Sequence, residues 1–429
     1  MVVVGAGTGR RGTCPYPDID LADPAFWRLP ADRREAAFAR LRRLPSPVFF
    51  VDRPAGRTRR MRGFHALVRH RDVVDASRKP DVFISGPGVT TPKPAGWVRF
   101  VFGDSMVNLD DPRHANLRGI VQKAFTPRVI AKITEDMQTV AAQIVDEVAA
   151  RGTGDFVETV AAQMPLRVIC EMMGIPDRYR ATLLARLNRA TESAGVSRSR
   201  WRRVPGRSLF ALARMHRVVA GVGRQRRLEP TDDLISALVT ANVDGKRLTS
   251  RELGSFFSLL LVAGVETTRN AIAHGLRLVT DNPEQRELLL SDFDKHGKGF
   301  VEEVVRHATP IIQFRRTVAR DFQLNGYRLG AGDEVVLFYN SANRDDSVFE
   351  TPDRFDITRS PNPHVGFGGG GPHFCLGTSL ARQELSVLFR ELFKRLPGIR
   401  SVGEPELVPS SFDNRVGRLR FTVGEGISS

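Results

Sequence analysis

The residues best suited to chemistry lie in a short loop around Cys375. Four successive glycines, residues 368–371, precede this cysteine, and residues 379–392 have the apolar spacing of a helix beginning just after it. Glycines leave backbone N–H groups free to approach another group. A thiolate at a helix N-terminus is stabilised by the helix dipole and by nearby N–H donors, which also tune a metal bound to the sulfur. The loop has the features of a stabilised thiolate.

Two other interpretations of Cys375 stay open from the residues alone. A single cysteine is most often a buried structural residue. A zinc site is the second alternative, but zinc needs further Cys or His ligands at short spacing, and only His373 is near. Neither alternative explains four glycines before the cysteine. Cys14, Cys170 and Cys375 are far apart and odd in number, so they form no disulfide framework.

The loop resembles the heme-binding loop of the cytochrome P-450 family. This resemblance implies heme b as cofactor, Cys375 as the axial iron ligand, and Gly377 as part of the cofactor-binding loop. A thiolate ligand pushes electron density onto iron and favours O–O cleavage. Where the family usually has a Phe, this chain has Gly368, and Phe367 stands one residue earlier. The longer loop is similar to that of an actinobacterial, lipid- and sterol-oxidising subset.

A second motif interrupts the apolar stretch 259–270. Gly264 costs about 1 kcal/mol in mid-helix relative to Ala, and Glu266 beside Thr267 is costly in an apolar helix unless it is partnered. Such local conflict often marks function, although a surface turn with a solvated Glu would also explain it. The motif resembles the family's oxygen-activation helix. By that resemblance Gly264 opens a groove for dioxygen, Thr267 holds water or dioxygen by hydrogen bonds, and Glu266, here replacing the commoner Asp, relays protons.

Several basic residues match positions that bind heme propionates in the family. His114 and Arg118 are four residues apart and share a helix face, which by itself is also typical of an ordinary basic surface. The resemblance adds Arg316 and His373, and cationic groups are what propionate carboxylates require. The neighbouring Arg315 remains the alternative to Arg316.

A third pattern concerns structure rather than catalysis. Glu303 and Arg306 are three residues apart on one helix face, a spacing that most often marks a surface ion pair. Together with Arg354 they resemble the family's buried Glu-Arg-Arg triad. This implies that the three residues fix the segment leading to the cysteine loop.

The expected substrate pocket is apolar with few polar groups. By the resemblance it lies above the distal face of the heme, although each of its members could equally be a core residue. The candidates are Trp97, Phe100, Phe102, Leu260, Ala263, Ile311, Ile312 and Phe314. By the resemblance, the Arg-rich stretch 198–207, with Trp201, falls where the family has its entrance lid. It is either a solvated loop or a surface for an acidic head group or an anionic membrane.

Helical periodicity dominates the elements that must position these residues. It covers residues 128–148, 253–278, 300–307 and 379–392. Strand patterns are fewer and include residues 47–51, 322–324 followed by an Asn325-Gly326 turn, and 335–339. We expect a mainly α protein with small sheets. The resemblance implies the cytochrome P-450 fold, with heme between the oxygen-activation helix and the helix after the Cys loop.

The expected organisation is a loose arm over residues 1–20 and one catalytic domain over residues 21–429. No stretch approaches the roughly 20 apolar residues of a membrane span, and the N-terminus lacks a signal-peptide pattern, so we expect a cytoplasmic protein. The net charge of +16 permits acidic partners, but no nucleic-acid-binding motif is visible.

The resemblance implies a monooxygenase that hydroxylates or epoxidises a lipid, terpenoid, steroid or polyketide. It would use O2 and electrons from NAD(P)H through ferredoxin reductase and ferredoxin, and Arg113, Lys123 and Arg382 suit an acidic ferredoxin. Two alternatives stay open. One is a heme-thiolate oxidase that inserts no oxygen, such as a peroxide user, and the other is a non-catalytic heme-binding protein.

Overall fold

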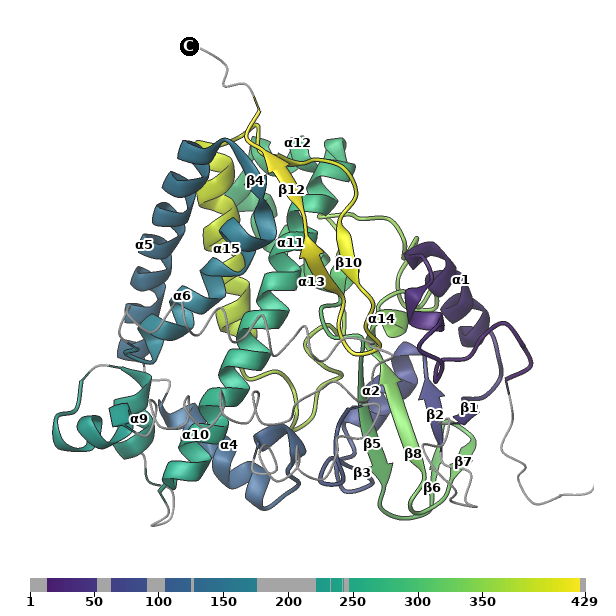
Figure 1. Ribbon diagram of the computed structural model, residues 1–429. Coiled ribbons are helices and arrows are strands. Elements are labelled where there is room, and N and C mark those ends of the chain that lie inside the picture. The colour runs from purple at the N-terminus through teal and green to yellow at the C-terminus, as the bar shows by residue number, and fades with distance from the viewer. Residues whose placement is uncertain are drawn as a thin grey trace, which may run out of the picture.

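The computed structural model describes residues 14–51, 63–90, 105–124, 127–175, 221–231, 233–240, 242 and 247–424. Helices form most of this part of the chain, and small sheets lie beside them (Figure 1). In the view of Figure 1 the helical part is on the left and a five-stranded sheet is at the lower right. The prediction of a mainly α protein with small sheets is confirmed.

The helices are of very different lengths, and the longest ones run side by side in the helical part (Figure 1). Their bounds are α1 Ala31–Arg42, α2 His70–Ser77, α4 Arg113–Ala124, α5 Pro127–Arg151, α6 Gln163–Met172, α9 Leu234–Thr240, α10 Ser250–Leu260, α11 Glu266–Asp281, α12 Pro283–Ser291, α13 Phe293–Ala308, α14 Tyr339–Ala342 and α15 Thr378–Arg395. Two π-helical turns, Val157–Ala161 and Leu261–Val265, precede α6 and α11.

The largest sheet has the strand order β1-β2-β8-β5-β3. Within it only β2 and β8 pair in parallel. The strands of this sheet are β1 Val48–Val51, β2 Gly63–Leu67, β3 Phe83–Ile84, β5 Gln313–Val318 and β8 Glu334–Phe338. The smaller sheets contain β4 Thr153–Asp155, β6 Phe322–Leu324, β7 Tyr327–Leu329, β9 Arg400–Ser401, β10 Glu406–Val408, β11 Arg415–Arg418 and β12 Arg420–Thr422.

Local sequence signals explain where several elements begin and end. Thr249 and Glu252 form a reciprocal capping box at the start of α10, since each accepts the backbone N–H of the other. Pro283 opens α12, where its missing N–H costs nothing. The β6–β7 hairpin turns at Asn325 and Gly326, both at positive φ, as the Asn-Gly pair predicts.

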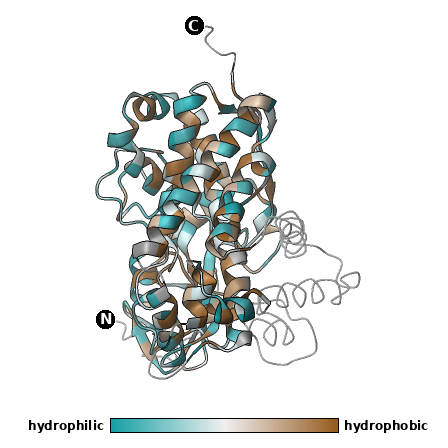
Figure 2. Cartoon of the chain, turned by 90° about the vertical axis from the view of Figure 1, so that its left-hand side faces the viewer, coloured by the Kyte–Doolittle hydropathy of each residue, from teal (hydrophilic) through white to brown (hydrophobic). Residues whose placement is uncertain are grey.

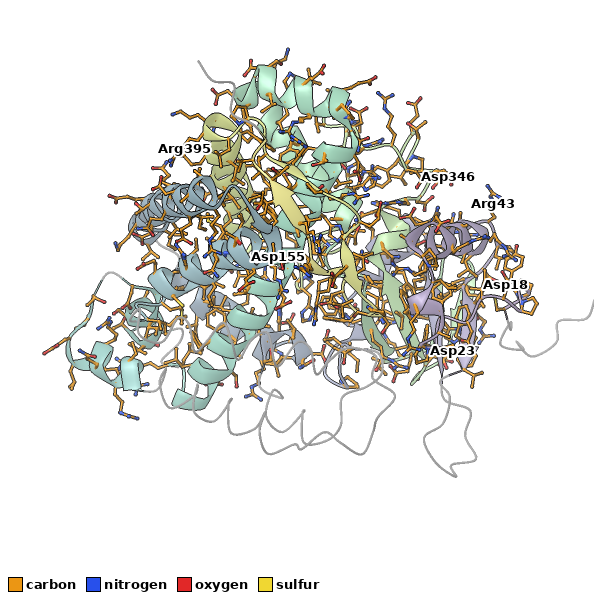
Figure 3. All side chains as sticks on the ribbon, turned by 45° about the horizontal axis from the view of Figure 1, so that its top comes forward. Asp18, Asp23, Arg43, Asp155, Asp346 and Arg395 are labelled. Carbon is orange, nitrogen blue, oxygen red and sulfur yellow. The ribbon has the colours of Figure 1, made fainter. Side chains whose placement is uncertain are left out.

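The main core lies between α5, α6, α11, α13 and α15. Apolar residues occupy the inward stripes of these helices and polar residues the outward ones, which gives the alternating colours of Figure 2. Ion pairs join the same helices at the surface: Arg395, labelled at the end of α15 in Figure 3, pairs with Asp146 of α5. The carboxylate of Asp155 accepts N–H groups from Val157 and Leu419, which ties β4 to the C-terminal strands. This core fixes α11 in the middle of the molecule.

Residues 14–20 differ from the predicted loose arm. Ile19 is buried in an apolar cluster with Phe26 and the first helix, and the guanidinium of Arg40 lies 4.1 Å from the ring centre of Tyr16. Asp18 pairs with Arg40 as well (Figure 3). The glycines between residues 5 and 12 and the prolines at positions 15 and 17 predicted disorder for the whole arm, but the few apolar side chains of residues 14–20 have a surface to pack against. The remainder of the expected arm, residues 1–13, lies outside the described residues.

In the described ranges, we find no helix with the length and hydrophobicity that crossing a membrane requires.

Candidate heme-thiolate site

The glycines before Cys375 are required by the path of the loop. Gly368, Gly370 and Gly371 have positive φ angles of 100°, 89° and 75°, which favour glycine. The loop also lies against the end of α2. A Cβ on Gly369 would come within 2.6 Å of the Ser77 hydroxyl, and one on Gly371 within 2.2 Å of the Ser77 carbonyl oxygen. The four glycines therefore let the loop turn tightly and pack directly on the backbone of α2.

Cys375 stands at the end of this loop, just before α15. Its backbone N–H donates to the carbonyl of Phe367 at 3.0 Å, which closes the loop. Burial raises the pKa of the Cys375 thiol, whereas the N–H of Gly377, the hydroxyl of Thr378 and the charge of Arg118 act to lower it. Cys375 is nevertheless exposed. The cysteine therefore lies close to hydrogen-bond donors and remains open to a ligand.

Two arginines and two histidines gather beside Cys375, and we call this group the cationic cluster because Arg118 and Arg316 carry its positive charge, whereas the lowered pKa values of His114 and His373 keep their rings neutral. The rings of His114 and His373 are 4.2 Å apart, and His114 and Arg118 come from α4 as their spacing predicts. Burial, then the charges of Arg316, His114 and Arg118, lower the pKa of His373 to about 3. The structure therefore brings together the four residues that were expected to bind propionates.

The structure also separates Arg316 from Arg315. The guanidinium of Arg315 bonds to the carboxylate of Glu334 at 3.0 Å, so it is occupied within the sheet. Arg316 points to the other side of β5, where its charge acts on His373 and on the hydroxyl of Tyr339. Alternation along the strand accounts for this difference, and it favours Arg316 as the cation of the cluster.

This donor set fits an iron porphyrin. The positive charges near His373 disfavour its protonation, so the same place favours anions. The two propionate carboxylates of heme b are such anions. A cysteine thiolate close to that cluster is a suitable axial ligand for the iron. In the described residues, three or more His, Cys, Asp or Glu side chains nowhere gather as a metal-binding group, which leaves the zinc interpretation of Cys375 without further ligands.

The oxygen-activation motif forms a π-helical turn, Leu261–Val265, between α10 and α11. Such turns in α-helices are frequent at functional sites because they free backbone groups from the regular ladder. The hydroxyl of Thr267 donates to the carbonyl of Ala263 at 2.5 Å. A Cβ on Gly264 would lie 2.9 Å from Ile169 of α6, so the glycine allows close packing of the two helices. Ala263 is exposed, although the neighbouring Val265 is fully buried.

Glu266 is buried in a network of charges. Its carboxylate pairs with Arg269 at 3.3 Å and lies 3.7 Å from Arg415, which in turn binds Asp413 at 2.7 Å. Burial raises the pKa of Glu266, although Arg269 and Arg415 act to lower it. One of its oxygens accepts no hydrogen bond in the described structure. This free oxygen and the raised pKa suit a group that takes up and releases protons.

The predicted structural triad contains one wrong member. Glu303 and Arg306 form a fully buried bidentate pair, and Arg306 also donates to the carbonyls of Asn343, Pro352 and Arg354. The second arginine is Arg359, whose Nε donates to Glu303 at 3.3 Å. The side chain of Arg354 is exposed, and this residue contributes its backbone carbonyl. The chain turns after Phe355, so Arg359 rather than Arg354 reaches the buried carboxylate.

The structure describes only some of the apolar residues that were expected to line the substrate pocket. Trp97, Phe100 and Phe102 lie outside the described residues, as does the Arg-rich stretch 198–207 with Trp201. Leu260, Ile311 and Phe314 are half-buried, and the ring of Phe314 lies 5.6 Å from that of Phe412.

Ile312 does not fit the expected pocket. It is 1% exposed and packs with Phe38 and Phe338 in the N-terminal core cluster, because it points to the opposite side of the sheet from its neighbours.

Several site residues were not identified from the sequence. The hydroxyl of Ser85 lies 3.2 Å from His373, and the carboxylate of Asp110 accepts the N–H groups of Ser85 and Gly86 beside it. Arg415 and Asp413 approach Glu266 from a segment more than a hundred residues away in the chain. These residues carry no local pattern, and only tertiary contacts bring them to the site.

The three basic residues that were expected to suit an acidic ferredoxin differ in exposure and in ion pairing. Arg113 is half-exposed, with its guanidinium 3.7 Å from Glu252, and Lys123 is exposed. Arg382 makes a bidentate pair with Glu302, so its charge is compensated within the protein.

The chain is similar to known proteins over almost its full length. Residues 297–397 match the family model described as Cytochrome P450. A "Methyl-branched lipid omega-hydroxylase" of Mycobacterium tuberculosis is 42% identical over 417 residues, which cover 95% of each chain. A "Steroid C26-monooxygenase" of Mycolicibacterium smegmatis is 36% identical, over 93% of this chain and 92% of the relative.

Solved structures agree with this similarity. A Mycobacterium marinum cytochrome P450 in complex with pseudoionone superimposes with a TM-score of 0.87 at 41% identity, covering 96% of this chain and 99% of that one. The predicted fold and the heme b cofactor are thereby confirmed. With a cysteine, a cationic cluster and an interrupted helix in one place, the chain belongs to the cytochrome P450 family of heme-thiolate monooxygenases.

Proposed function

We propose that this monooxygenase hydroxylates a methyl-branched, lipid-like molecule. The observation that carries the proposal is the position of Cys375, which is exposed and lies next to the cluster of His114, Arg118, Arg316 and His373. The substrate class rests on similarity to relatives whose names state methyl-branched lipids and steroids. Terpenoids and polyketides remain the alternative substrates of the same chemistry.

Each part of the site has a distinct task in this proposal. Cys375 ligates the iron, while the N–H of Gly377 moderates the charge on the sulfur. The cationic cluster anchors the propionates of heme b, which supplies the oxidising chemistry when bound. Gly264 lets the π-helical turn pack closely on α6, and dioxygen is proposed to bind beside this turn, where Ala263 is exposed. The hydroxyl of Thr267 donates to the Ala263 carbonyl and is proposed to accept a hydrogen bond from water, while Glu266 passes protons inward.

The apolar side chains near α11 are proposed to hold the substrate. Leu260, Ala263, Ile311 and Phe314 are the proposed lining of the substrate pocket among the described residues. Trp97, Phe100 and Phe102 lie outside the described residues and stay candidates by the resemblance alone. Phe412, which packs on Phe314, belongs to the same wall. Such a lining selects substrates by shape and apolar area rather than by polar contacts.

Electron supply and location complete the proposal. Electrons from NAD(P)H reach the heme through a ferredoxin reductase and an acidic ferredoxin in the cytoplasm. Arg113 and Lys123 of α4 contribute to the docking surface, since this helix also carries Arg118 beside Cys375. The main core combines buried residues from Leu109 to Phe421, which supports one catalytic domain.

Two measurements test this function. The reduced protein with carbon monoxide should show the red-shifted Soret band of thiolate ligation, and Cys375→Ser should lose that band while a Cys14→Ser control keeps it. With NAD(P)H, ferredoxin and reductase, a methyl-branched fatty acid should then gain one hydroxyl group, detected by mass spectrometry. A band typical of histidine ligation contradicts the site, and a thiolate band without oxygenated product from lipids, terpenoids or steroids contradicts the proposed substrates.

A further inference from the structure

A carboxylate that the proposed mechanism does not use lies under the cysteine loop. Glu302 belongs to α13 and is adjacent in sequence to the triad residue Glu303, but it points to a different set of partners. Arg382 of α15 binds both of its oxygens, with the second N–O distance at 2.7 Å. The Nε2 atom of His364 lies 2.9 Å from the same carboxylate. These bonds lower the pKa of Glu302 to about 2, against the effect of burial, so it is charged at neutral pH.

The hydrogen bonds fix the form of His364. Its Nδ1 accepts the backbone N–H of Gly366 at 3.2 Å, so the proton of the neutral ring is on Nε2 and is donated to Glu302. The His364 side chain is only 3% exposed. Glu302 therefore orients two side chains at once, one from the cysteine loop and one from α15.

Both of these side chains hold Phe367. The guanidinium carbon of Arg382 lies 4.7 Å from the centre of the Phe367 ring, within the range of a cation–π contact. The ring of His364 is 5.7 Å from that of Phe367, at an angle of 47°. The carbonyl of Phe367 accepts the N–H of Cys375. The ring of Phe367 is thus held by Arg382 and His364, both of which bind Glu302. The backbone of Phe367 is held by Cys375.

We propose that Glu302 is a positioning residue that holds Phe367 against the Cys375 loop, through Arg382 and His364, and thereby sets the reduction potential of the bound heme. A displaced Phe367 would change the hydrogen bond at Cys375 and the access of water to its sulfur. Hydrogen bonding, burial and solvent access around a ligand sulfur are known determinants of iron potential. This inference rests on the proposed ligand role of Cys375.

The test is a double-mutant cycle on the heme-loaded enzyme, read by the midpoint potential from spectroelectrochemical titration. Phe367→Leu should shift the potential in the wild-type background. In a Glu302→Gln background the same change should shift it by less than half as much, because the ring is already released. Equal shifts in both backgrounds would overturn the proposal.

A second variant distinguishes the position of the Arg382 side chain from its charge. Arg382→Lys keeps the positive charge but loses the planar fork and the stacking on Phe367. We expect it to change the potential and to lower the share of the thiolate-type carbon monoxide band, as Glu302→Gln does. If the pair acts only as a charge, Arg382→Lys will match the wild type, and the positional role is excluded.

The chain contains a matched control for this pair. Arg390 of α15 binds Asp294 of α13 at 2.7 Å, and its guanidinium carbon lies 4.8 Å from the centre of the Phe293 ring. This pair joins the same two helices but lies about two turns farther from the cysteine loop than the pair of Arg382 and Glu302 does. Asp294→Asn should leave the potential unchanged. If it shifts the potential as much as Glu302→Gln does, the effect is a general one of helix packing and the proposal fails.

The failure of the proposed function would look different. In that case the wild-type protein itself would lack the thiolate-type carbon monoxide band, and no potential of a thiolate-ligated heme could be measured. If the wild-type protein has the thiolate-type band but Phe367→Leu shifts the potential equally in both backgrounds, only the proposed role of Glu302 is contradicted, and the proposed function stands.

Discussion

At the residue scale, Glu266 is a buried acid that its surroundings only partly neutralise. Arg269 and Arg415 both favour its charged form, but Asp413 competes for Arg415 and burial opposes the charge. Because the sum of these effects raises its pKa, the protonated form persists to higher pH than in an ordinary glutamic acid. The residue can therefore hold a proton in the pH range where an enzyme works.

We predict that Glu266→Gln lowers the rate of product formation by about 100-fold, the range expected when a positioned acid–base group is lost. Heme content and the thiolate-type carbon monoxide band should stay normal, since Cys375 is untouched. In the wild type, turnover should fall as pH rises through the raised pKa, because the proton-donating form of Glu266 is then lost. The variant should lack this dependence. Steady-state rates across pH would measure both effects, and an unchanged pH profile would exclude Glu266 as the donor.

At the scale of elements, the segment between β8 and the cysteine loop depends on a buried ionic network. Arg359 donates to Glu303 and to the carbonyls of Glu350, Thr351 and Arg354, so it binds the segment both to α13 and to itself. Removal of one partner from a buried charge pair leaves the other uncompensated, which is far more costly than loss of a surface pair.

We predict that Arg359→Ala lowers the free energy of unfolding by about 3–5 kcal/mol and reduces the heme content of the purified protein. Arg354→Ala is the matched control, because its side chain is exposed and only its backbone takes part. The control should change stability by about 0.5 kcal/mol or less. Urea unfolding and the ratio of heme to protein absorbance provide the measurements. If Arg354→Ala is the more damaging change, the assignment of Arg359 is wrong.

Local patterns predicted the elements better than they predicted the contacts between them. The apolar spacing of residues 300–307 and 379–392 correctly indicated α13 and α15, and the Asn-Gly pair indicated the β6–β7 turn. The sequence could not distinguish Arg354 from Arg359, because the path of the chain between them decides which one meets Glu303. The partners of Glu266 could not be identified from the sequence either, because Arg415 and Asp413 approach it from a hairpin that is distant along the chain.

At the scale of the whole molecule, the core between α5, α6, α11 and α15 holds the two sides of the site in place. It fixes the π-helical turn before α11, and it fixes the start of α15, three residues after Cys375. The cationic cluster completes the site from α4 and β5. The catalytic groups therefore come from elements that are distant in sequence but belong to one rigid framework.

The charge of the whole chain, +16, favours an acidic electron donor. We predict that the dissociation constant for an acidic bacterial ferredoxin rises steeply with salt, since exposed charges more than about 8 Å apart are screened at physiological ionic strength. Lys123→Gln, on the exposed surface of α4, should weaken binding several-fold, mainly by slowing association. Lys394→Gln, near the far end of α15 from Cys375, is the control and should bind as the wild type does. Surface plasmon resonance over a range of salt concentrations measures both rates, and an affinity independent of salt would contradict electrostatic docking at α4.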